Sequence, residues 1–323
     1  MNWDNVIGDN RRMKFWVGLT DGDWHGVVSR LAGVDEVNFW QPGENARAFR
    51  AIAVGEPFLF KLHSPANYIV GGGFFAHWTL LPISLAWEAF GTKNGAMSYL
   101  DMRRMIMRLR GPERVRNEDF QIGCVLLEQP FFFDRADWIP APSDWRAAIQ
   151  RGKRYSIDDP VGRQIWDSIQ LRLAKKGKPW LSDRRTEEGP RYGTPLMVRP
   201  RLGQGSFRVL VTDAYQRSCA ISGEHSLPAL EAAHIMPFNE SGPHAVSNGI
   251  LLRSDFHRLF DRGYLTVMPE YRIEVSKKLK EEFENGRSYY PYQGHTLSHF
   301  PKAPNDWPQK ELLAWHNENV FKA

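Results

Sequence analysis

Residues 230–263 read LEAAHIMPFNESGPHAVSNGILLRSDFHRLFDRG, and this stretch decides the fold of the second half of the chain. The segments CAISG at residues 219–223 and ALEAAHIMP at residues 229–237 predict two short strands. A helix is expected to begin at Ser254, with Asp255 favoured in its first turn by the helix dipole, and to be capped by Gly263. The predicted order is strand, strand, helix, followed by a hairpin that turns at residues 269–270.

Four polar residues recur at defined intervals in this region. Asn248 follows His234 by fourteen residues, His257 comes nine residues later, and Asp261 lies four beyond that. Because residues four apart on a helix lie one turn from each other, His257 and Asp261 could share one cation. The alternative is an aspartate that merely hydrogen-bonds a histidine on a surface helix, which is the commoner arrangement for an isolated pair.

The motifs CAISG, LEAAHI, NGILL and HRLFDRG, taken with this spacing, resemble the HNH (ββα-metal) nuclease family, in the form found in bacterial restriction endonucleases. The resemblance covers residues 200–270 and implies metal-dependent hydrolysis of phosphodiester bonds in double-stranded DNA. It makes His234 the general base, because a neutral imidazole can take a proton from water near neutral pH. It makes His257 and Asp261 metal ligands, and Asn248 the residue that fixes the strand relative to the helix.

One position departs from the family pattern. Many members carry an acidic residue or a histidine directly before the base, where it also binds the metal, whereas this chain has Ala233. Glu231 lies on the same side of a regular strand but about 7 Å further along, so we do not expect it to replace that ligand. We expect water to complete the metal shell. A site of mixed nitrogen and oxygen donors with few protein ligands suits Mg²⁺ or Mn²⁺.

Positive charge is concentrated in the middle of the chain. The net charge is +5, yet residues 143–215 hold 15 Lys or Arg against 8 Asp or Glu, a net of +7, which leaves −2 for the remainder. Such a run suits a polyanionic partner, although it is often only solvated surface. Beside the nuclease motif, we expect a track of arginines along the DNA phosphates, formed by Arg201, Arg208, Arg253, Arg258 and Arg262.

Composition divides the chain into two domains of an α+β protein. FWVGLT, EPFLFKLH, NYIVGGGFFAHW and GCVLLEQPFFF predict strands, while SLAWEAFG and YLDMRRMIMRLRG predict helices. Residues 12–140 are therefore expected to form a curved β-barrel domain with helices. Residues 141–199 are first Pro-rich and then basic, which predicts a partly helical linker. Residues 200–323 are the predicted nuclease domain, in which Ser206 caps a helix that runs to residue 216.

Residues 37–75, VNFWQPGENARAFRAIAVGEPFLFKLHSPANYIVGGGFF, resemble the PUA-like superfamily, which includes the SRA and EVE readers. The resemblance implies a domain that recognises a methylated or hydroxymethylated base, such as a modified cytosine, by flipping it into an aromatic pocket. For each aromatic residue alone, core packing is the alternative. The candidate pocket residues are Trp24, Asn38, Phe39, Trp40, Tyr68 and Trp78.

Cysteine content and hydropathy limit the setting. Cys124 and Cys219 are the only cysteines, which excludes a disulfide framework or a four-cysteine zinc site. No secretory or membrane-spanning run is present, so a cytoplasmic protein without a membrane partner is expected. The prediction is a modification-dependent restriction endonuclease, and cleavage of both DNA strands with one site per chain predicts a homodimer. The alternatives are an HNH nuclease acting on unmodified DNA or RNA, and a nucleic-acid-binding protein with a degenerate nuclease.

Overall fold

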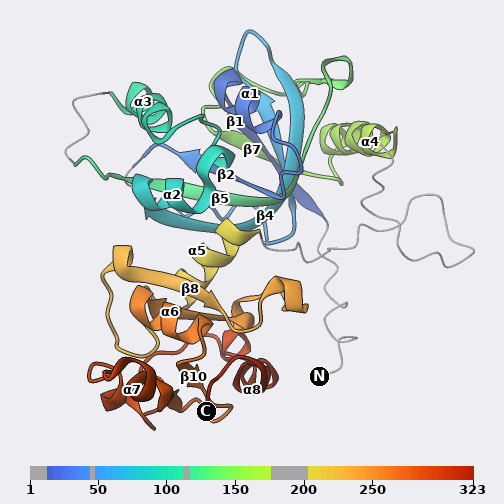
Figure 1. Ribbon diagram of the computed structural model, residues 1–323. Helices are drawn as coiled ribbons and strands as arrows, with labels where there is room; N and C mark the ends of the chain where they lie inside the picture. Colours follow the sequence, from blue (N-terminus) through green and yellow to red (C-terminus); the bar gives the residue numbers. More distant parts are fainter. Residues whose placement is uncertain (1–12, 44–47, 112–116, 176–202) are drawn as a thin grey trace, which may run out of the picture. The chain divides into compact units, whose positions relative to one another are not determined.

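The computed structural model describes residues 13–43, 48–111, 117–175 and 203–323, and the chain divides into two compact units, residues 1–201 and 202–323 (Figure 1). Both units combine helices with sheets, which confirms the predicted α+β class. Each unit has a hydrophobic core of its own. None of the helices in the described part of the chain has the length and apolar content needed to span a lipid bilayer.

The first unit is built on one sheet with the strand order β2-β5-β4-β3-β1-β7, and β6 pairs with the start of β4. β1 is parallel to β3, and the other neighbours are antiparallel. Among the described residues no pairing joins the edge strands β2 and β7, so the sheet is open rather than a closed barrel, and two register shifts bend β4. The strands are β1 (Lys14–Thr20), β2 (Glu36–Gln41), β3 (Pro57–Leu62), β4 (Tyr68–Pro82), β5 (Gln121–Phe132), β6 (Ile139–Pro140) and β7 (Gly152–Ser156).

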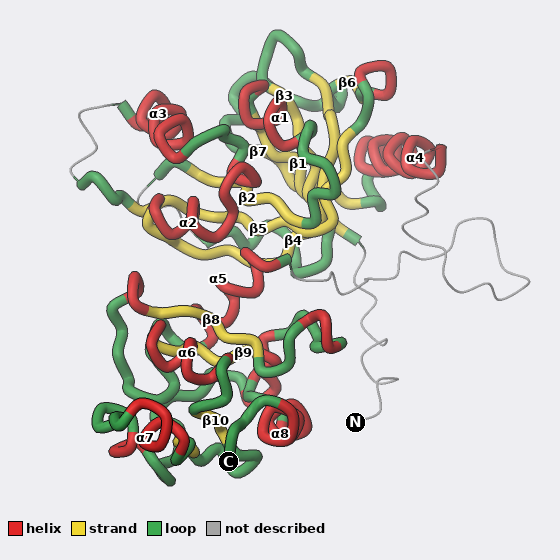
Figure 2. The backbone as a smooth tube through the Cα atoms, viewed as in Figure 1, coloured by secondary structure: helices red, strands yellow, loops and turns green. Residues whose placement is uncertain are grey.

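The helices of the first unit begin where side chains satisfy their free N–H groups. Asp21 accepts a hydrogen bond from the backbone N–H of Trp24 at the start of α1 (Gly22–Val28), and Ser98 caps α3 (Tyr99–Arg110) in the same way. Between them, α2 (Ile83–Phe90) follows β4 directly (Figure 2). The helices α2 and α3 were predicted from their periodicity, whereas α1 was not.

The predicted linker is wrong for residues 152–175. β7 pairs with β1 along its whole length, and α4 (Pro160–Lys175) packs onto the same core as Phe15 and Val17 of β1. Buried Ile165, Ile169 and Leu173 form a stripe with helical spacing along α4. Cations occupy other positions of this helix, and the linker was predicted from those cations and not from the apolar stripe. Residues 176–199 of the predicted linker lie outside the described residues.

The second unit begins with α5 (Gln204–Ala214), and β8 (Leu230–His234) pairs antiparallel with β9 (Gly249–Arg253). α6 (Ser254–Asp261) follows β9 directly and packs on both strands. β10 (Leu265–Val267) and β11 (Ile273–Val275) form the predicted hairpin, and Gly263 has the positive φ of +75° expected after a helix. α7 (Lys278–Phe283) and α8 (Lys310–Asn319) complete the unit.

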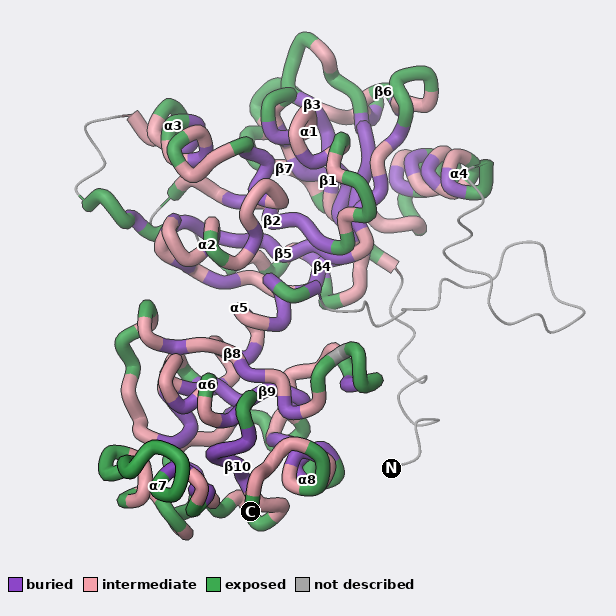
Figure 3. The backbone as a smooth tube through the Cα atoms, in the orientation of Figure 1, coloured by how far each residue is buried: buried purple, intermediate pink, exposed green. Residues whose placement is uncertain are grey.

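Two local predictions for this unit are wrong. Residues 219–223 form a turn and not a strand, because the Gly223 N–H bonds back to the Cys219 carbonyl at 3.0 Å and Gly223 has a φ of +72°. The second strand is β9 instead. Ser206 does not cap α5 but is buried within it, and Gly203 precedes the helix. The core of the unit includes Phe256 and Phe260 of α6, both fully buried. The strand β10 is buried along its length as well (Figure 3).

Candidate active site

His257 of α6 lies between two carboxylates. Its Nδ1 is 2.6 Å from Oε2 of Glu231 on β8, and its Nε2 is 3.3 Å from Oδ2 of Asp261, one turn along the helix. The pairing of β8 with β9, which leads straight into α6, places Glu231 beneath the helix. The structure therefore brings the two predicted metal residues together and adds Glu231, which sequence reasoning set aside.

The facing atoms of His257 and Asp261 suit a shared cation. Two donors bound to one octahedral ion at about 2.1 Å lie about 3 Å apart, close to the separation of Nε2 and Oδ2. The hydrogen bond between Nδ1 and Glu231 fixes the ring with Nε2 toward Asp261. Partial desolvation raises the pKa of Asp261. Positive charge on His257 lowers this pKa, and the negative charge of Glu231 raises it. A divalent cation would relieve the repulsion between the carboxylates.

The protein supplies an incomplete metal shell. Within the described ranges, no group of three or more His, Cys, Asp or Glu has the arrangement of a complete metal site. Ala233, at the position where many HNH nucleases carry another ligand, is fully buried in the core. Glu231 does not fill that position, because its carboxylate is engaged with Nδ1 of His257. Water and substrate oxygens would have to supply the remaining ligands.

His234 ends β8, and its ring stacks on Phe207 of α5 with centroids 3.7 Å apart and an interplanar angle of 9°. Burial, together with smaller contributions from positive charge on His244 and on His257, lowers the pKa of His234 to about 4. Its Nε2 is buried and has no hydrogen-bond partner among the described residues. His234 is therefore a neutral imidazole at pH 7, as a general base requires.

His234 does not touch the Glu231, His257 and Asp261 cluster. Side chains alternate along a strand, so Glu231 projects toward α6 and His234 toward α5. A positive charge on His257 nevertheless contributes to the lowered pKa of His234. The predicted base, at the end of β8, and the predicted metal ligands, beside Glu231, thus lie on opposite faces of the strand.

Asn248 holds the loop between β8 and β9. It is fully buried, its Oδ1 accepts a hydrogen bond from the Met236 N–H at 2.9 Å, and its Nδ2 donates to the carbonyls of Met236 at 2.9 Å and Pro243 at 3.0 Å. These three bonds satisfy the amide on both sides. The geometry is the one expected for an orienting residue that ties the end of the strand to the loop.

The predicted arginine track is only partly available. Arg253 makes a two-pronged ion pair with Asp255, with N–O distances of 2.6 and 2.8 Å, and its guanidinium lies 4.5 Å from the Phe256 ring centroid. Its charge is therefore compensated by Asp255 within the unit. Arg258 and Arg262 are exposed, and Arg208 is half-buried on α5. Arg201 lies outside the described residues.

The six candidate base-pocket residues do not form one open pocket. Trp24, Asn38 and Trp40 are 3%, 0% and 8% exposed, and Asn38 bonds the side-chain oxygen of Asn94 at 2.9 Å while Trp40 donates to its carbonyl at 2.8 Å. These three residues are buried in the unit. Phe39 is half-buried, and its ring centroid lies 4.8 Å from that of Phe58. Such positions were predicted from residue type alone, which does not separate a packed core from a binding pocket. Tyr68 and Trp78 are less buried and lie apart along β4.

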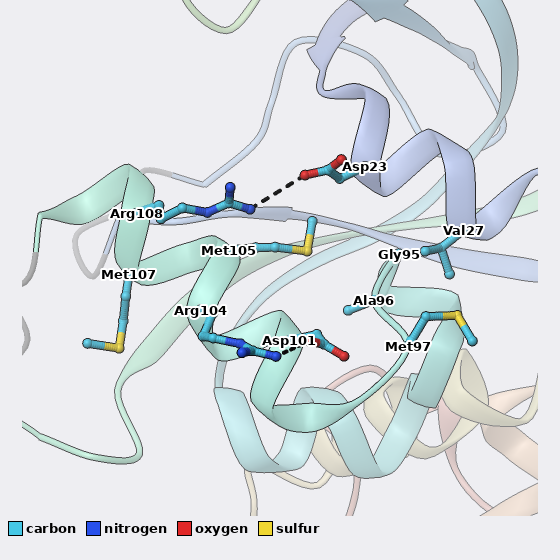
Figure 4. Close-up of a pocket in the computed structure, with 10 residues that line it drawn as sticks. All are labelled: Asp23, Val27, Gly95, Ala96, Met97, Asp101, Arg104, Met105, Met107 and Arg108. Atoms are coloured by element: carbon cyan, nitrogen blue, oxygen red, sulfur yellow. Dashed lines mark hydrogen bonds and ion pairs between the residues drawn. The ribbon is translucent and has the colours of Figure 1, made fainter.

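A pocket between α1 and α3 was missed by sequence reasoning. Its volume is about 680 Å³, and its walls are mainly apolar (Figure 4). Two ion pairs, Asp23 with Arg108 at 3.5 Å and Asp101 with Arg104, also line it. The repeated methionines of α3 were the available signal, because an amphipathic helix with soft apolar side chains on more than one face often lines a pocket. The lining residues are Asp23, Val27, Gly95, Ala96, Met97, Asp101, Arg104, Met105, Met107 and Arg108.

Comparison with known proteins gives a family for part of the chain. Residues 219–268 match the model of the HNH_2 family, described as HNH endonuclease. This match confirms the resemblance predicted from the motifs. No curated protein matches the chain significantly.

Two solved structures show low similarity. An ASCH protein from Zymomonas mobilis is 10% identical, with a TM-score of 0.32, and the match covers 47% of this chain and 94% of that one. The modification-dependent TagI restriction endonuclease is 12% identical, with a TM-score of 0.27, and the match covers 94% of this chain and 81% of that one. Neither similarity is high enough to support a structural argument. The family match, to an HNH endonuclease model, therefore covers residues 219–268 of this chain.

Proposed function

We propose that this chain is a metal-dependent endonuclease that hydrolyses phosphodiester bonds of double-stranded DNA. The observation that carries the proposal is the contact of His257 with Glu231 on one side and Asp261 on the other, with a neutral His234 at the end of the same strand. The HNH endonuclease match over these residues supports it independently. Mg²⁺ or Mn²⁺ is the expected cation, because the donors are an imidazole nitrogen and carboxylate oxygens.

In this proposal each side chain has one task. His234 accepts a proton from the attacking water, and the negative phosphate beside it raises its pKa from about 4 toward the working pH. His257 and Asp261 would hold a divalent cation, which when bound would supply positive charge to stabilise the phosphate and the departing 3′ oxygen. Glu231 keeps the His257 ring oriented, and Asn248 holds the loop at the end of the base strand.

The first test is plasmid cleavage with Mg²⁺ and with Mn²⁺. His234→Ala should bind DNA like the parent but cut at least about 100-fold more slowly, since general base catalysis contributes about 10² to 10⁴ in rate. The exposed His225, in the loop before β8, provides the matched control, and His225→Ala should cut like the parent. Asp261→Asn should raise the metal concentration needed for cleavage. An unchanged metal titration would remove Asp261 from the ligand set.

We further propose that the first unit selects DNA with a methylated or hydroxymethylated base, and that two chains act together, one on each strand. The resemblance of residues 37–75 to PUA-like readers supports this finer proposal. Trp78 is the pocket candidate to vary first, because its indole N–H is buried without a partner among the described residues. Paired digestion of modified and unmodified DNA of one sequence tests the specificity, and equal cutting of both would remove it.

A second candidate is a nucleic-acid-binding protein whose nuclease is inactive. One observation favours it: Ala233 supplies no ligand, and no complete metal site is found in the described parts of the chain. The two candidates differ in the behaviour of the parent protein. If it binds DNA and remains inert with Mg²⁺, Mn²⁺ and other divalent ions, the binding-only function is the correct one.

A further inference from the structure

A third histidine, His244, lies beside the predicted base. It belongs to the loop between β8 and β9, and its ring meets the His234 ring edge to face, with centroids 6.2 Å apart and an interplanar angle of 81°. Both side chains are half-buried. The spacing of the HNH motif gives no reason to select His244, so only the folded loop reveals that two imidazoles share this place.

The loop that carries His244 is held by short-range contacts. The carbonyl oxygen of Pro243 accepts two hydrogen bonds. One comes from the backbone N–H of Ala245 at 3.0 Å and the other from Nδ2 of Asn248 at 3.0 Å. A Cβ atom at Gly242 would lie 1.9 Å from the carbonyl oxygen of Met236, so this close approach of the two backbone segments requires glycine.

One buried amide therefore positions both rings. Asn248 bonds the backbone of Met236, two residues after His234, and the carbonyl of Pro243, directly before His244. The double attachment ties the backbone beside His234 to the backbone beside His244, so the two imidazoles are carried by segments that are held together.

The surroundings of His234 favour its neutral form. Its ring is stacked on Phe207, and loss of water there disfavours a charged imidazole, as does a positive charge on His244. Neutral His234 can accept a proton, so the second ring of the pair is the one left to donate a hydrogen bond to a phosphodiester placed beside it.

We propose that His244 is a catalytic residue of this site, an imidazole whose ring N–H donates a hydrogen bond to a non-bridging oxygen of the scissile phosphate. The inference rests on the proposed nuclease function and deepens it. As water attacks, its proton passes to His234 and its oxygen bonds to phosphorus. The bond from phosphorus to the 3′ oxygen then breaks, and its electron pair leaves with that oxygen. His244 keeps its proton throughout and stabilises the charge that gathers on the phosphate oxygens.

Single-turnover cleavage with saturating Mn²⁺ tests the role. His244→Ala should slow cleavage about 100-fold, because removing one such donor costs about 10² to 10³ in rate. His244→Gln, a neutral donor, should fall between alanine and the parent. His244→Lys supplies an N–H donor again and should recover about tenfold over alanine. DNA affinity without metal should change less than about threefold, since only one of several phosphate contacts is lost. His225→Ala is again the matched control.

The outcomes separate the two proposals. If the parent cuts and His244→Ala cuts equally fast, the role of His244 is overturned while the nuclease stands. If all three variants are equally slow and melt at the parental temperature, donation of a hydrogen bond is not the role of His244 and the inference is overturned. If the alanine variant melts at a lower temperature, the role of His244 is judged instead from the cleavage rates of those glutamine and lysine variants that keep the parental melting temperature. A parent that cuts under no divalent condition overturns both proposals together.

Discussion

Glu128 on β5 should limit the stability of the first unit. It is fully buried opposite Glu36 of β2, and neither of its carboxylate oxygens has a hydrogen-bond partner among the described residues. Burial, with the negative charges of Glu36 and Asp35, raises the pKa of Glu128 from 4.5 to about 8. The ammonium group of Lys93 pairs with the other two carboxylates, with Asp35 at 2.6 Å and with Glu36 at 3.0 Å. Glu128 is therefore a neutral acid at pH 7.

The magnitude follows from the shift in pKa. Because the folded state holds this proton more tightly than the unfolded state, the associated stability is complete below pH 4.5 and is lost as the pH rises through 8. At about 1.4 kcal/mol per pKa unit, the loss is about 3 kcal/mol at pH 7 and about 5 kcal/mol well above pH 8. Glu128→Gln is neutral at every pH and nearly isosteric, so it should recover most of this loss.

Urea unfolding at pH 5, 7 and 9, followed by tryptophan fluorescence, measures the effect. Of the 12 tryptophans only Trp307 and Trp315 lie in the second unit, so the signal reports mainly the first. The gain in the free energy of unfolding should be below about 1 kcal/mol at pH 5 and should grow at pH 7 and pH 9. Glu118→Gln, at an exposed position of the same unit, is the control. A gain that does not change with pH, or no gain at pH 9, would refute the reasoning.

Three further perturbations address the second unit. Asn248→Ala should lower the free energy of unfolding by about 2 kcal/mol, because it leaves buried backbone groups unpaired, and calorimetry showing less than about 0.5 kcal/mol would contradict the role of this amide. His234 in metal-free protein should titrate near pH 4 by NMR, and a midpoint at the ordinary 6.5 would mean that its ring is open to water. Glu231→Gln should weaken Mn²⁺ binding about tenfold in an equilibrium titration, because the His257 ring loses its orienting carboxylate; unchanged affinity would show that this contact is incidental.

Local patterns were enough to predict β8 and α6, which carry His234, His257 and Asp261, although they did not predict β9. The helical stripe of Phe256 and Phe260 and the Gly263 stop define α6 without reference to the rest of the chain. His257 and Asp261 are neighbours on that helix, so their contact follows from helical geometry alone. The HNH spacing then identified His234 as their counterpart on a strand.

Contacts between distant segments could not be predicted in the same way. Glu231 reaches His257 because β8 pairs with β9 in one particular register, and a shift of one residue would turn Glu231 away from the helix. The stacking of Phe207 on His234 depends on how α5 packs against the strands. The buried positions of Trp24 and Trp40 depend on the helices that cover the sheet, which is why residue type alone suggested a base pocket there.

The pairing of β7 with β1 has a practical consequence for dividing this protein. A fragment that ended at residue 140 would lose the partner strand of β1 and the apolar stripe of α4. It would bare the backbone edge of β1 together with the side chains of Phe15 and Val17, a combination that promotes aggregation. A fragment that extends through residue 175 retains both β7 and α4. We therefore expect binding studies on the isolated first unit to succeed with a fragment that ends there and not with one that ends at residue 140.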